Sequence, residues 1–215
     1  MTTTSQPRPL RADAQRNHDR IVVAAGEAFA ELGLDVSMEE IARRAGVGPA
    51  TLYRRFPNKQ ALLRAIFEAG LAKLEPTLAA AAAQDDAWEG LLAGMSTLLE
   101  AQAANMALVQ VLAAAGELTL LKDELRARVF EPLDALFARA QASGQVRADL
   151  DPRELHLLIR MVSCTTEPDD AGASAATWRR YLTLLADALR TPTPTPLPPA
   201  WGPGTKSRRG AKRPH

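Results

Sequence analysis

The stretch that decides the fold is residues 37–59, which read S-M-E-E-I-A-R-R-A-G-V-G-P-A-T-L-Y-R-R-F-P-N-K. Ser37 is a preferred helix N-cap, and Glu40 three residues later completes a capping box, so a helix is expected to begin directly after the serine. Gly46 predicts the end of that helix, because glycine adopts the left-handed backbone of a helix C-terminus at little cost. Pro49 suits the first turn of a second helix, which the next proline ends. Two short helices joined by a tight glycine turn indicate a helix-turn-helix.

The polar side chains of the second helix indicate what this unit could bind. Leu52 and Phe56 are four residues apart and are expected to face inward together with Val47. Small residues let a helix approach base edges in the major groove, whereas hydroxyl and guanidinium groups suit phosphate oxygens. The predicted DNA-binding residues are Ser37, Arg43, Arg44, Gly48, Pro49, Ala50, Thr51, Tyr53, Arg54 and Lys59.

From these residues alone, a pair of surface helices with a solvated basic face is an equal alternative. A resemblance favours DNA binding: residues 21–67 resemble the DNA-binding domain of TetR-type transcriptional repressors. It is carried by I-V-V-A-A-G-E-A-F-A-E-L-G-L at 21–34 and by I-A-x-x-A-G-V-x-x-x-T-L-Y-x-x-F-x-x-K at 41–59. The resemblance implies a homodimer that binds a double-stranded DNA operator.

The composition favours an all-α fold. Only 5% of the residues are aromatic and alanine is abundant, which suits close-packed helices better than a sheet. Together with the resemblance, this predicts an N-terminal three-helix DNA-binding domain followed by a helical-bundle regulatory and dimerisation domain. The expected divisions are a flexible arm at 1–13, the helix-turn-helix domain at 14–60, the bundle at 61–190, and a Pro-rich, basic, disordered tail at 191–215.

Helical periodicity predicts the elements of each domain. In the first domain the opening helix is expected from about Ala14 to Leu32. A long helix begins near Asn58, and Pro76 within it predicts either a kink or a boundary between two helices. Breaks at glycine and proline predict the later helices at Ala87–Ala104, Met106–Ala115, Leu118–Ser143, Pro152–Cys164 and Ser174–Arg190.

Several classes of protein are disfavoured. No run of about eighteen apolar residues occurs, so no membrane span is expected. The N-terminus lacks the apolar segment of a secretion signal, and a single cysteine suits a reducing cytoplasm. No phosphate-binding glycine loop, paired Cys/His set or H-E-x-x-H is present, so neither a cofactor nor a metal is expected. Nothing places Ser96, Cys164 and His156 together as a nucleophile and base, so we do not expect an enzyme.

Charge is unevenly distributed along the chain. Residues 1–60 carry nine Lys/Arg and seven Asp/Glu, residues 61–200 carry twelve and eighteen, and residues 201–215 carry five and none. Two basic ends therefore flank an acidic middle, and a polyanion should meet the ends. Each end suits either a disordered segment or one that adds contacts to DNA.

The apolar residues of the second domain have two interpretations. Those between the helices suit either a plain core or a cavity, and the resemblance implies a small-molecule effector site there. The residues of this predicted pocket are Trp88, Leu92, Met95, Met106, Phe130, Phe137, Met161 and Cys164. The stripes on the last two helices suit burial in one chain or pairing of two chains, and the resemblance implies a dimer interface. Its predicted residues are Leu155, Leu158, Ile159, Val162, Trp178, Tyr181, Leu182 and Leu185.

These features together predict a cytoplasmic repressor that an unidentified small molecule releases from an inverted-repeat operator. Activation is an alternative to repression, because the direction of regulation depends on where the operator lies relative to a promoter. Two alternatives belong to other classes. One is a small-molecule-binding protein whose helix-turn-helix no longer reads a specific site, and the other is an enzyme that uses the bundle cavity.

Overall fold

The computed structural model describes residues 8–105, 109, 111, 116, 121–166, 177–190 and 193–198. All regular elements in this part of the chain are helical, with no strand among them, so the all-α prediction is confirmed. In chain order they are α1 (Arg8–Leu32), η1 (Gly33–Asp35), α2 (Met38–Ala45), α3 (Pro49–Arg55), α4 (Lys59–Ala82), α5 (Ala87–Ala104), α8 (Lys122–Leu125), η2 (Arg126–Phe130), α9 (Glu131–Ala142), α10 (Pro152–Ser163), η3 (Cys164–Thr166) and α11 (Thr177–Arg190).

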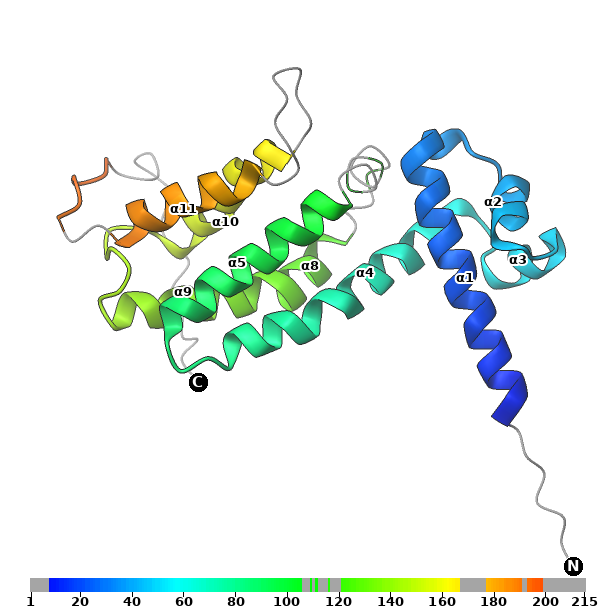
Figure 1. Ribbon diagram of the computed structural model, residues 1–215, viewed down its shortest axis with the longest axis horizontal. Coiled ribbons are helices and arrows are strands. Elements are labelled where there is room, and N and C mark those ends of the chain that lie inside the picture. The colour runs from blue at the N-terminus through cyan, green and yellow to red at the C-terminus, as the bar shows by residue number, and fades with distance from the viewer. Residues whose placement is uncertain are drawn as a thin grey trace, which may run out of the picture.

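The helices form two groups that α4 connects (Figure 1). Helices α1, α2 and α3 gather around the beginning of α4, and their buried residues form one apolar core. The rest of α4 packs with α5, α9, α10 and α11 in a longer bundle that has its own core. The chain is therefore elongated, with the helix-turn-helix at one end.

Three local signals set the helix-turn-helix as predicted, although the Glu40 carboxylate binds Arg43 and Arg44, so only the Ser37 half of the expected capping box is observed. The Ser37 hydroxyl oxygen accepts a hydrogen bond from the backbone N–H of Glu40 at 3.1 Å. Gly46 has a left-handed backbone with φ +64°, and its N–H bonds to the carbonyl oxygens of the last turn of α2. Pro49 is the first residue of α3. These three roles are local, because each depends on neighbours a few residues away.

The first helix is longer than predicted. It begins at Arg8 and not near Ala14, so the expected flexible arm at 1–13 is shortened at its C-terminal side. Pro9 does not prevent this extension, because the N–H groups in the first turn of a helix have no intrahelical partner. Residues 1–7 lie outside the described part of the chain.

Helix α4 passes from one core to the other without interruption. The Asn58 side chain caps it by accepting the Ala61 N–H at 2.8 Å. Leu62, Leu63 and Ile66 are buried in the N-terminal core, and the buried residues from Phe67 onward belong to the bundle core, although Ala69 still contacts the first. The change of core therefore comes inside α4, after the boundary predicted at residue 60, because a helix can bury successive turns in different cores.

Pro76 lies inside α4 and does not end it, so of the two alternatives left by the sequence a boundary between two helices is wrong. A proline leaves the carbonyl of the residue four positions earlier, here Ala72, without its helical partner. Both residues are on the exposed side of α4, where water can bind that carbonyl.

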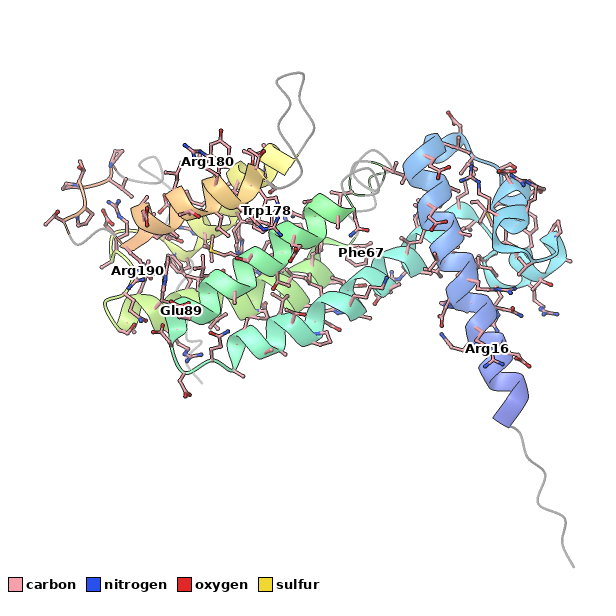
Figure 2. All side chains as sticks on the ribbon, viewed as in Figure 1. Arg16, Phe67, Glu89, Trp178, Arg180 and Arg190 are labelled. Carbon is pink, nitrogen blue, oxygen red and sulfur yellow. The ribbon has the colours of Figure 1, made fainter. Side chains whose placement is uncertain are left out.

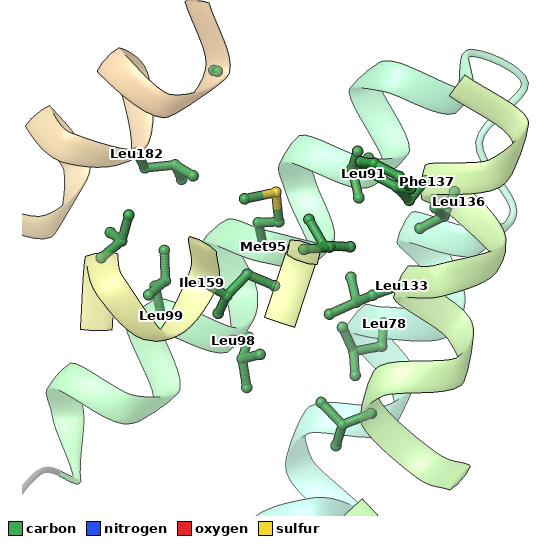
Figure 3. Packing of buried hydrophobic residues seen from close by; sticks show 14 of the residues in the cluster. Leu78, Leu91, Met95, Leu98, Leu99, Leu133, Leu136, Phe137, Ile159 and Leu182 are labelled. Carbon is green, nitrogen blue, oxygen red and sulfur yellow. The ribbon is translucent and has the colours of Figure 1, made fainter. Parts of the chain in front are cut away.

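The bundle core gathers around α5, whose buried residues face those of the other bundle helices (Figure 3). Gly90 and Gly94 let α5 approach its neighbours closely. A Cβ atom at Gly90 would lie 2.5 Å from the Ala81 carbonyl oxygen on α4, and one at Gly94 would lie 2.6 Å from Leu133 Cδ2 on α9. These two glycines therefore serve packing, although neither lies in a turn.

The predicted bundle helices are largely confirmed. Helix α5 has the predicted bounds, and α10 begins at Pro152 behind a capping box of Asp151 and Glu154. The single helix expected at 118–143 instead contains a π-helical turn between α8 and α9. Most of the predicted helix Met106–Ala115 lies outside the described residues.

The described part of the tail, residues 193–198, is not helical, as its prolines require. It is bonded to the bundle at two points, contrary to the expected disorder. Arg147 donates to the Thr195 carbonyl oxygen at 2.7 Å, and the Leu197 N–H donates to Asp149. Residues 199–215 lie outside the described part of the chain.

Candidate nucleic-acid interface

Apolar residues fix which face of α3 is exposed. Leu52 is fully buried in the N-terminal core, Phe56 is nearly so, and Val47 in the turn is half-buried. These three side chains point inward as predicted. The opposite face of α3 is therefore turned to solvent.

The exposed start of α3 has only small side chains. Gly48, Pro49 and Ala50 are exposed and have at most a small side chain, while Thr51 is half-buried. Arg54 is exposed farther along the same helix. A first turn of this shape can bring the helix backbone close to base edges in the major groove.

Tyr53 is exposed on α3 and is bonded to α2. Its hydroxyl donates to Oε1 of Glu39, with 3.0 Å between the two oxygens. The pKa of Glu39 is lowered, first by a hydrogen bond that its carboxylate accepts from its own backbone N–H and then by the bond from Tyr53. The same bond raises the pKa of the Tyr53 phenol. Tyr53 thus keeps its proton, and its hydroxyl must turn from Glu39 to donate to another acceptor.

Glu40 binds both arginines of α2. Nε and Nη2 of Arg43 each lie 2.7 Å from a Glu40 oxygen, and Nε of Arg44 lies 3.0 Å from Oε1. These bonds, with those from Arg43 first, lower the pKa of Glu40 to about 2. Arg44 also donates to Glu31 of α1 at 2.6 Å, and only 24% of its side chain is exposed, against 72% for Arg43. Arg44 therefore joins α1 to α2, and Arg43 is the more accessible cation.

Two further basic residues bind the backbone of their own chain. Lys59 Nζ donates to the Leu34 carbonyl oxygen at 2.6 Å, and Arg55 donates to the Ala14 carbonyl oxygen at 3.0 Å. The phosphate contact predicted for Lys59 therefore has an internal competitor. The sequence contained no signal for this bond, because 25 positions separate its partners.

The structure separates the predicted DNA-binding residues into two sets. Arg44 and Lys59 are tied into the domain, and Thr51 is half-buried. Sequence reasoning overlooked Glu39, whose place beside Tyr53 results from the packing of α2 against α3. The predicted residues that are exposed are Ser37, Arg43, Gly48, Pro49, Ala50, Tyr53 and Arg54.

The predicted effector pocket needs correction. Trp88, Met95 and Phe137 are buried in the bundle, and Leu92 and Phe130 are half-buried against it. In contrast, Met161 is 67% exposed and Cys164 is exposed, so neither lines a cavity between the helices. Met161 lies on α10 and Cys164 on η3, and both face outward because other apolar residues of α10 occupy its inner side. Met106 lies outside the described residues.

The predicted dimer interface also needs correction. Five of its residues are buried in the core of their own chain, namely Leu155, Ile159, Val162, Trp178 and Leu182. Leu158 and Leu185 are half-buried, and Tyr181 is exposed. The reason is that α10 and α11 have apolar residues on two faces, and the predicted residues other than Tyr181 lie wholly or partly on the inner one. The exposed apolar residues of these helices are Leu157, Met161, Tyr181 and Leu184.

Within the described residues, none of the helices combines the length and apolarity required to cross a membrane. In the same part of the chain, no three His, Cys, Asp or Glu side chains gather closely enough to hold a metal ion.

Comparison with known proteins matches both parts of the chain. Residues 21–66 match a family model described as bacterial regulatory proteins of the tetR family. Residues 86–191 match the model of the C-terminal domain of SbtR-like transcriptional regulators. An HTH-type transcriptional regulator of Staphylococcus aureus is 43% identical over 54 residues, which are 25% of this chain and 29% of that protein. The chain thus spans less than a third of the curated relatives it matches.

Solved structures cover much more of the chain. The TetR transcription regulatory protein from Mycobacterium vanbaalenii is 35% identical, with a TM-score of 0.61 over 85% of this chain and 99% of that one. The TetR transcriptional regulator SCO0520 from Streptomyces coelicolor is 31% identical, with a TM-score of 0.59 over 80% and 98%. The regulator FadR from Bacillus subtilis, solved with stearoyl-CoA, shares the fold at 23% identity, with a TM-score of 0.65 over 79% and 97%.

The first family model agrees with the helix-turn-helix geometry, and the second model and a relative that is 35% identical over nearly its whole length extend the match to the bundle. The chain belongs to the TetR family, whose members are DNA-binding transcriptional regulators and not enzymes.

Proposed function

We propose that the chain is a homodimeric repressor whose two α3 helices read an inverted-repeat operator, and that a small-molecule effector releases it. The observation that carries this proposal is that the exposed start of α3 has only small side chains, at Gly48, Pro49 and Ala50, with Tyr53 and Arg54 exposed on the same helix. Small residues admit the helix to the base edges, and hydroxyl and guanidinium groups bind phosphates. Because its target is DNA, we assign its action to the cytoplasm.

Individual residues take different roles in this proposal. Tyr53, Arg43 and Arg54 are exposed polar groups that suit phosphate oxygens. Arg44 and Lys59 brace the domain through Glu31 and the Leu34 carbonyl, and thereby hold α2 and α4 in place. Their contribution to DNA binding is mainly to the shape of the reading head, which is the N-terminal domain formed by α1, α2 and α3.

A second copy of the chain supplies the second α3 helix. Leu157, Met161, Tyr181 and Leu184 are large apolar side chains exposed on α10 and α11. Large exposed apolar residues on two helices that pack together favour an interface, and most homodimers are twofold symmetric. Two reading heads related by a twofold axis suit half-sites about 34–36 Å apart.

The effector is proposed to bind among the helices of the bundle. The FadR protein from Bacillus subtilis was solved with stearoyl-CoA, which supports a ligand site in this fold without identifying the ligand of this chain. Trp88, Met95 and Phe137 are the apolar residues that suit its lining. To release DNA, the effector must bind the non-binding geometry more tightly than the DNA-binding one.

Selection of bound sequences from random duplex DNA tests the proposal. Wild-type protein is expected to enrich one inverted repeat. The Tyr53→Phe variant, which lacks one hydroxyl, should bind all sequences more weakly by up to about tenfold, the value of one net hydrogen bond. Lys73→Ala, at an exposed position on α4 in the bundle, is the control and should bind as the wild type does.

Two results would contradict parts of the proposal. A change of base preference at one position in Tyr53→Phe would show that this residue reads a base and not a phosphate. Salt-sensitive binding without any enriched sequence would instead favour a small-molecule-binding protein whose helix-turn-helix no longer reads a specific site.

A further inference from the structure

Helix α4 is the mechanical link between the bundle and the reading head. Its buried residues up to Ile66 belong to the N-terminal core, those from Phe67 onward belong to the bundle core, and half-buried Ala69 still packs against the N-terminal core. Figure 2 marks Phe67 on α4, at the end of the bundle nearer the N-terminal domain. The direction in which α4 leaves the bundle therefore determines where the reading head lies.

Three ion pairs fasten this part of α4 to the segment formed by α8 and η2. Arg64 of α4 donates to Glu124 at 2.5 Å. Arg128 of η2 donates to two carboxylates of α4: its Nη1 lies 2.7 Å from Glu68 Oε2, and its Nε lies 2.5 Å from Glu75 Oε1. Glu68 and Glu75 are two helical turns apart on the same face of α4. One guanidinium group thus spans about two turns of the helix.

The electrostatics agree with this geometry. The bond from Arg128 is the largest cause of the lowered pKa values of Glu68 and Glu75. In return, the two carboxylates raise the pKa of Arg128. All three groups are therefore charged at neutral pH, and removal of Arg128 would leave two neighbouring negative charges on α4.

Arg128 lies within a π-helical turn. Residues 126–130 form a π-helical turn, in which the Glu131 N–H bonds to the carbonyl oxygen of Arg126, five residues back. Such a turn changes the direction of the side chains around it and often occurs at functional sites. The neighbouring Val129 is fully buried in the bundle core and anchors the turn.

We propose that Arg128 is a positioning residue for DNA binding, which clamps α4 to the η2 turn and thereby sets the orientation of the reading head. This inference rests on the proposed function. Arg128 lies in the bundle, so it acts on DNA only through α4. A displacement of the η2 turn would be transmitted to α4 through the two bonds of one side chain.

Arginine suits this role better than lysine. Its planar guanidinium donates in two fixed directions and can hold two carboxylates, whereas a lysine ammonium is a single point charge. The three side chains are partly exposed, and such pairs contribute little to stability individually. The expected consequence of losing Arg128 is therefore a change in geometry more than a loss of folding.

The first test varies the distance between half-sites. Once the operator is known, a library that keeps both half-sites and changes their spacing is bound by the wild type, Arg128→Met and Arg179→Met. The last variant breaks the exposed Arg179–Glu100 pair between α11 and α5, which does not involve α4. Arg128→Met is expected to lose about tenfold in affinity at the wild-type spacing, within the usual range of coupling between sites, and to accept other spacings.

Two further readouts separate positioning from direct contact. The salt dependence of binding should be unchanged in Arg128→Met, because no phosphate contact is lost. Adding Glu75→Gln to Arg128→Met should cause less loss than the two single effects combined, because both act through one bond. Equal weakening at all spacings would overturn the proposal, since a stability defect affects every operator alike.

The second test needs no DNA. Spin labels at Glu27→Cys on α1 and Ala138→Cys on α9, in a Cys164→Ser chain diluted with unlabelled chain, report the distance between head and bundle. The wild type and Arg179→Met should give one narrow distribution, and Arg128→Met a broader or displaced one. An unchanged distribution in Arg128→Met would overturn the clamp. If the wild type selects no operator, the proposed function fails, while this measurement still decides whether Arg128 positions the head.

Discussion

The helix-turn-helix and the helical bundle use the same secondary structure but specify it differently. In the helix-turn-helix, single residues mark each bend: Ser37 caps α2, Gly46 ends it, and Pro49 begins α3. In the bundle, α10 and α11 have apolar residues on two faces, and packing decides which face is buried. Sequence therefore predicts the inward and outward positions of a short unit with strong local signals, whereas in the bundle it predicts the helices but not which of two apolar faces is buried.

The largest expected effect tests whether the two cores are separate. Leu52 is fully buried in the N-terminal core, so Leu52→Ala should lower the free energy of unfolding of that domain by about 2–5 kcal/mol. Hydrogen exchange should show faster amide exchange in α1–α3 and little change in α9 and α10. Leu32→Ala, at an exposed leucine of α1, is the matched control and should change stability by less than about 0.5 kcal/mol. An equal rise in amide exchange in both domains would show that the two cores do not unfold separately.

The next effect tests how tightly the bundle is packed. A Cβ atom at Gly90 would lie 2.5 Å from the Ala81 carbonyl oxygen and 2.9 Å from Leu136 Cδ2. Gly90→Ala should therefore lower the free energy of unfolding, measured with urea, by about 1–3 kcal/mol. Gly70→Ala, where the added atom meets open space on α4, should raise it by roughly 0.5–1 kcal/mol. Stabilisation by both changes would show that α5 does not need its close approach to α4.

A smaller effect distinguishes the two kinds of arginine in the reading head. Arg54 is exposed, whereas Arg44 is bonded to Glu31 and Glu40. Arg54→Ala should reduce the slope of log affinity against log salt by about 0.9, the value for one phosphate contact. Arg44→Ala should leave that slope unchanged and instead lower the melting temperature of the N-terminal domain. The reverse pattern, measured by fluorescence anisotropy in a salt series, would exchange the roles assigned to these residues.

The smallest effect concerns the pH dependence of the same domain. Bonds from Arg43 and Arg44 lower the pKa of Glu40 from an unfolded value of 4.5 to about 2. Because the folded pKa is the lower one, the carboxylate stabilises the folded state above about pH 4.5, and this contribution is lost as pH falls toward 2. The stability difference between wild type and Glu40→Gln, followed by urea unfolding between pH 6 and 2.5, should shrink with acidity. In a chain that also contains Arg43→Met and Arg44→Met, the difference should no longer depend on pH.

Sequence patterns predicted the helix-turn-helix well because its determinants are close together in the chain. The inward positions of Leu52 and Phe56 followed from helical spacing, and the cap at Ser37 followed from residue type. The long-range bonds of Arg44 and Lys59 were not predictable, because their partners on α1 and η1 are distant in sequence. The place of Glu39 beside Tyr53 was missed for the same reason.

By itself, then, the sequence determined the all-α class, the family resemblance and the local geometry of α2 and α3, since each depends on short-range periodicity and caps. Tertiary structure alone decided which apolar faces of α10 and α11 are buried, and thus that Met161 lies outside while Leu155 lies inside. It also placed Arg128 between Glu68 and Glu75. The physical reason is that burial and ion pairing depend on which helices meet, and residues far apart in the chain supply the partners.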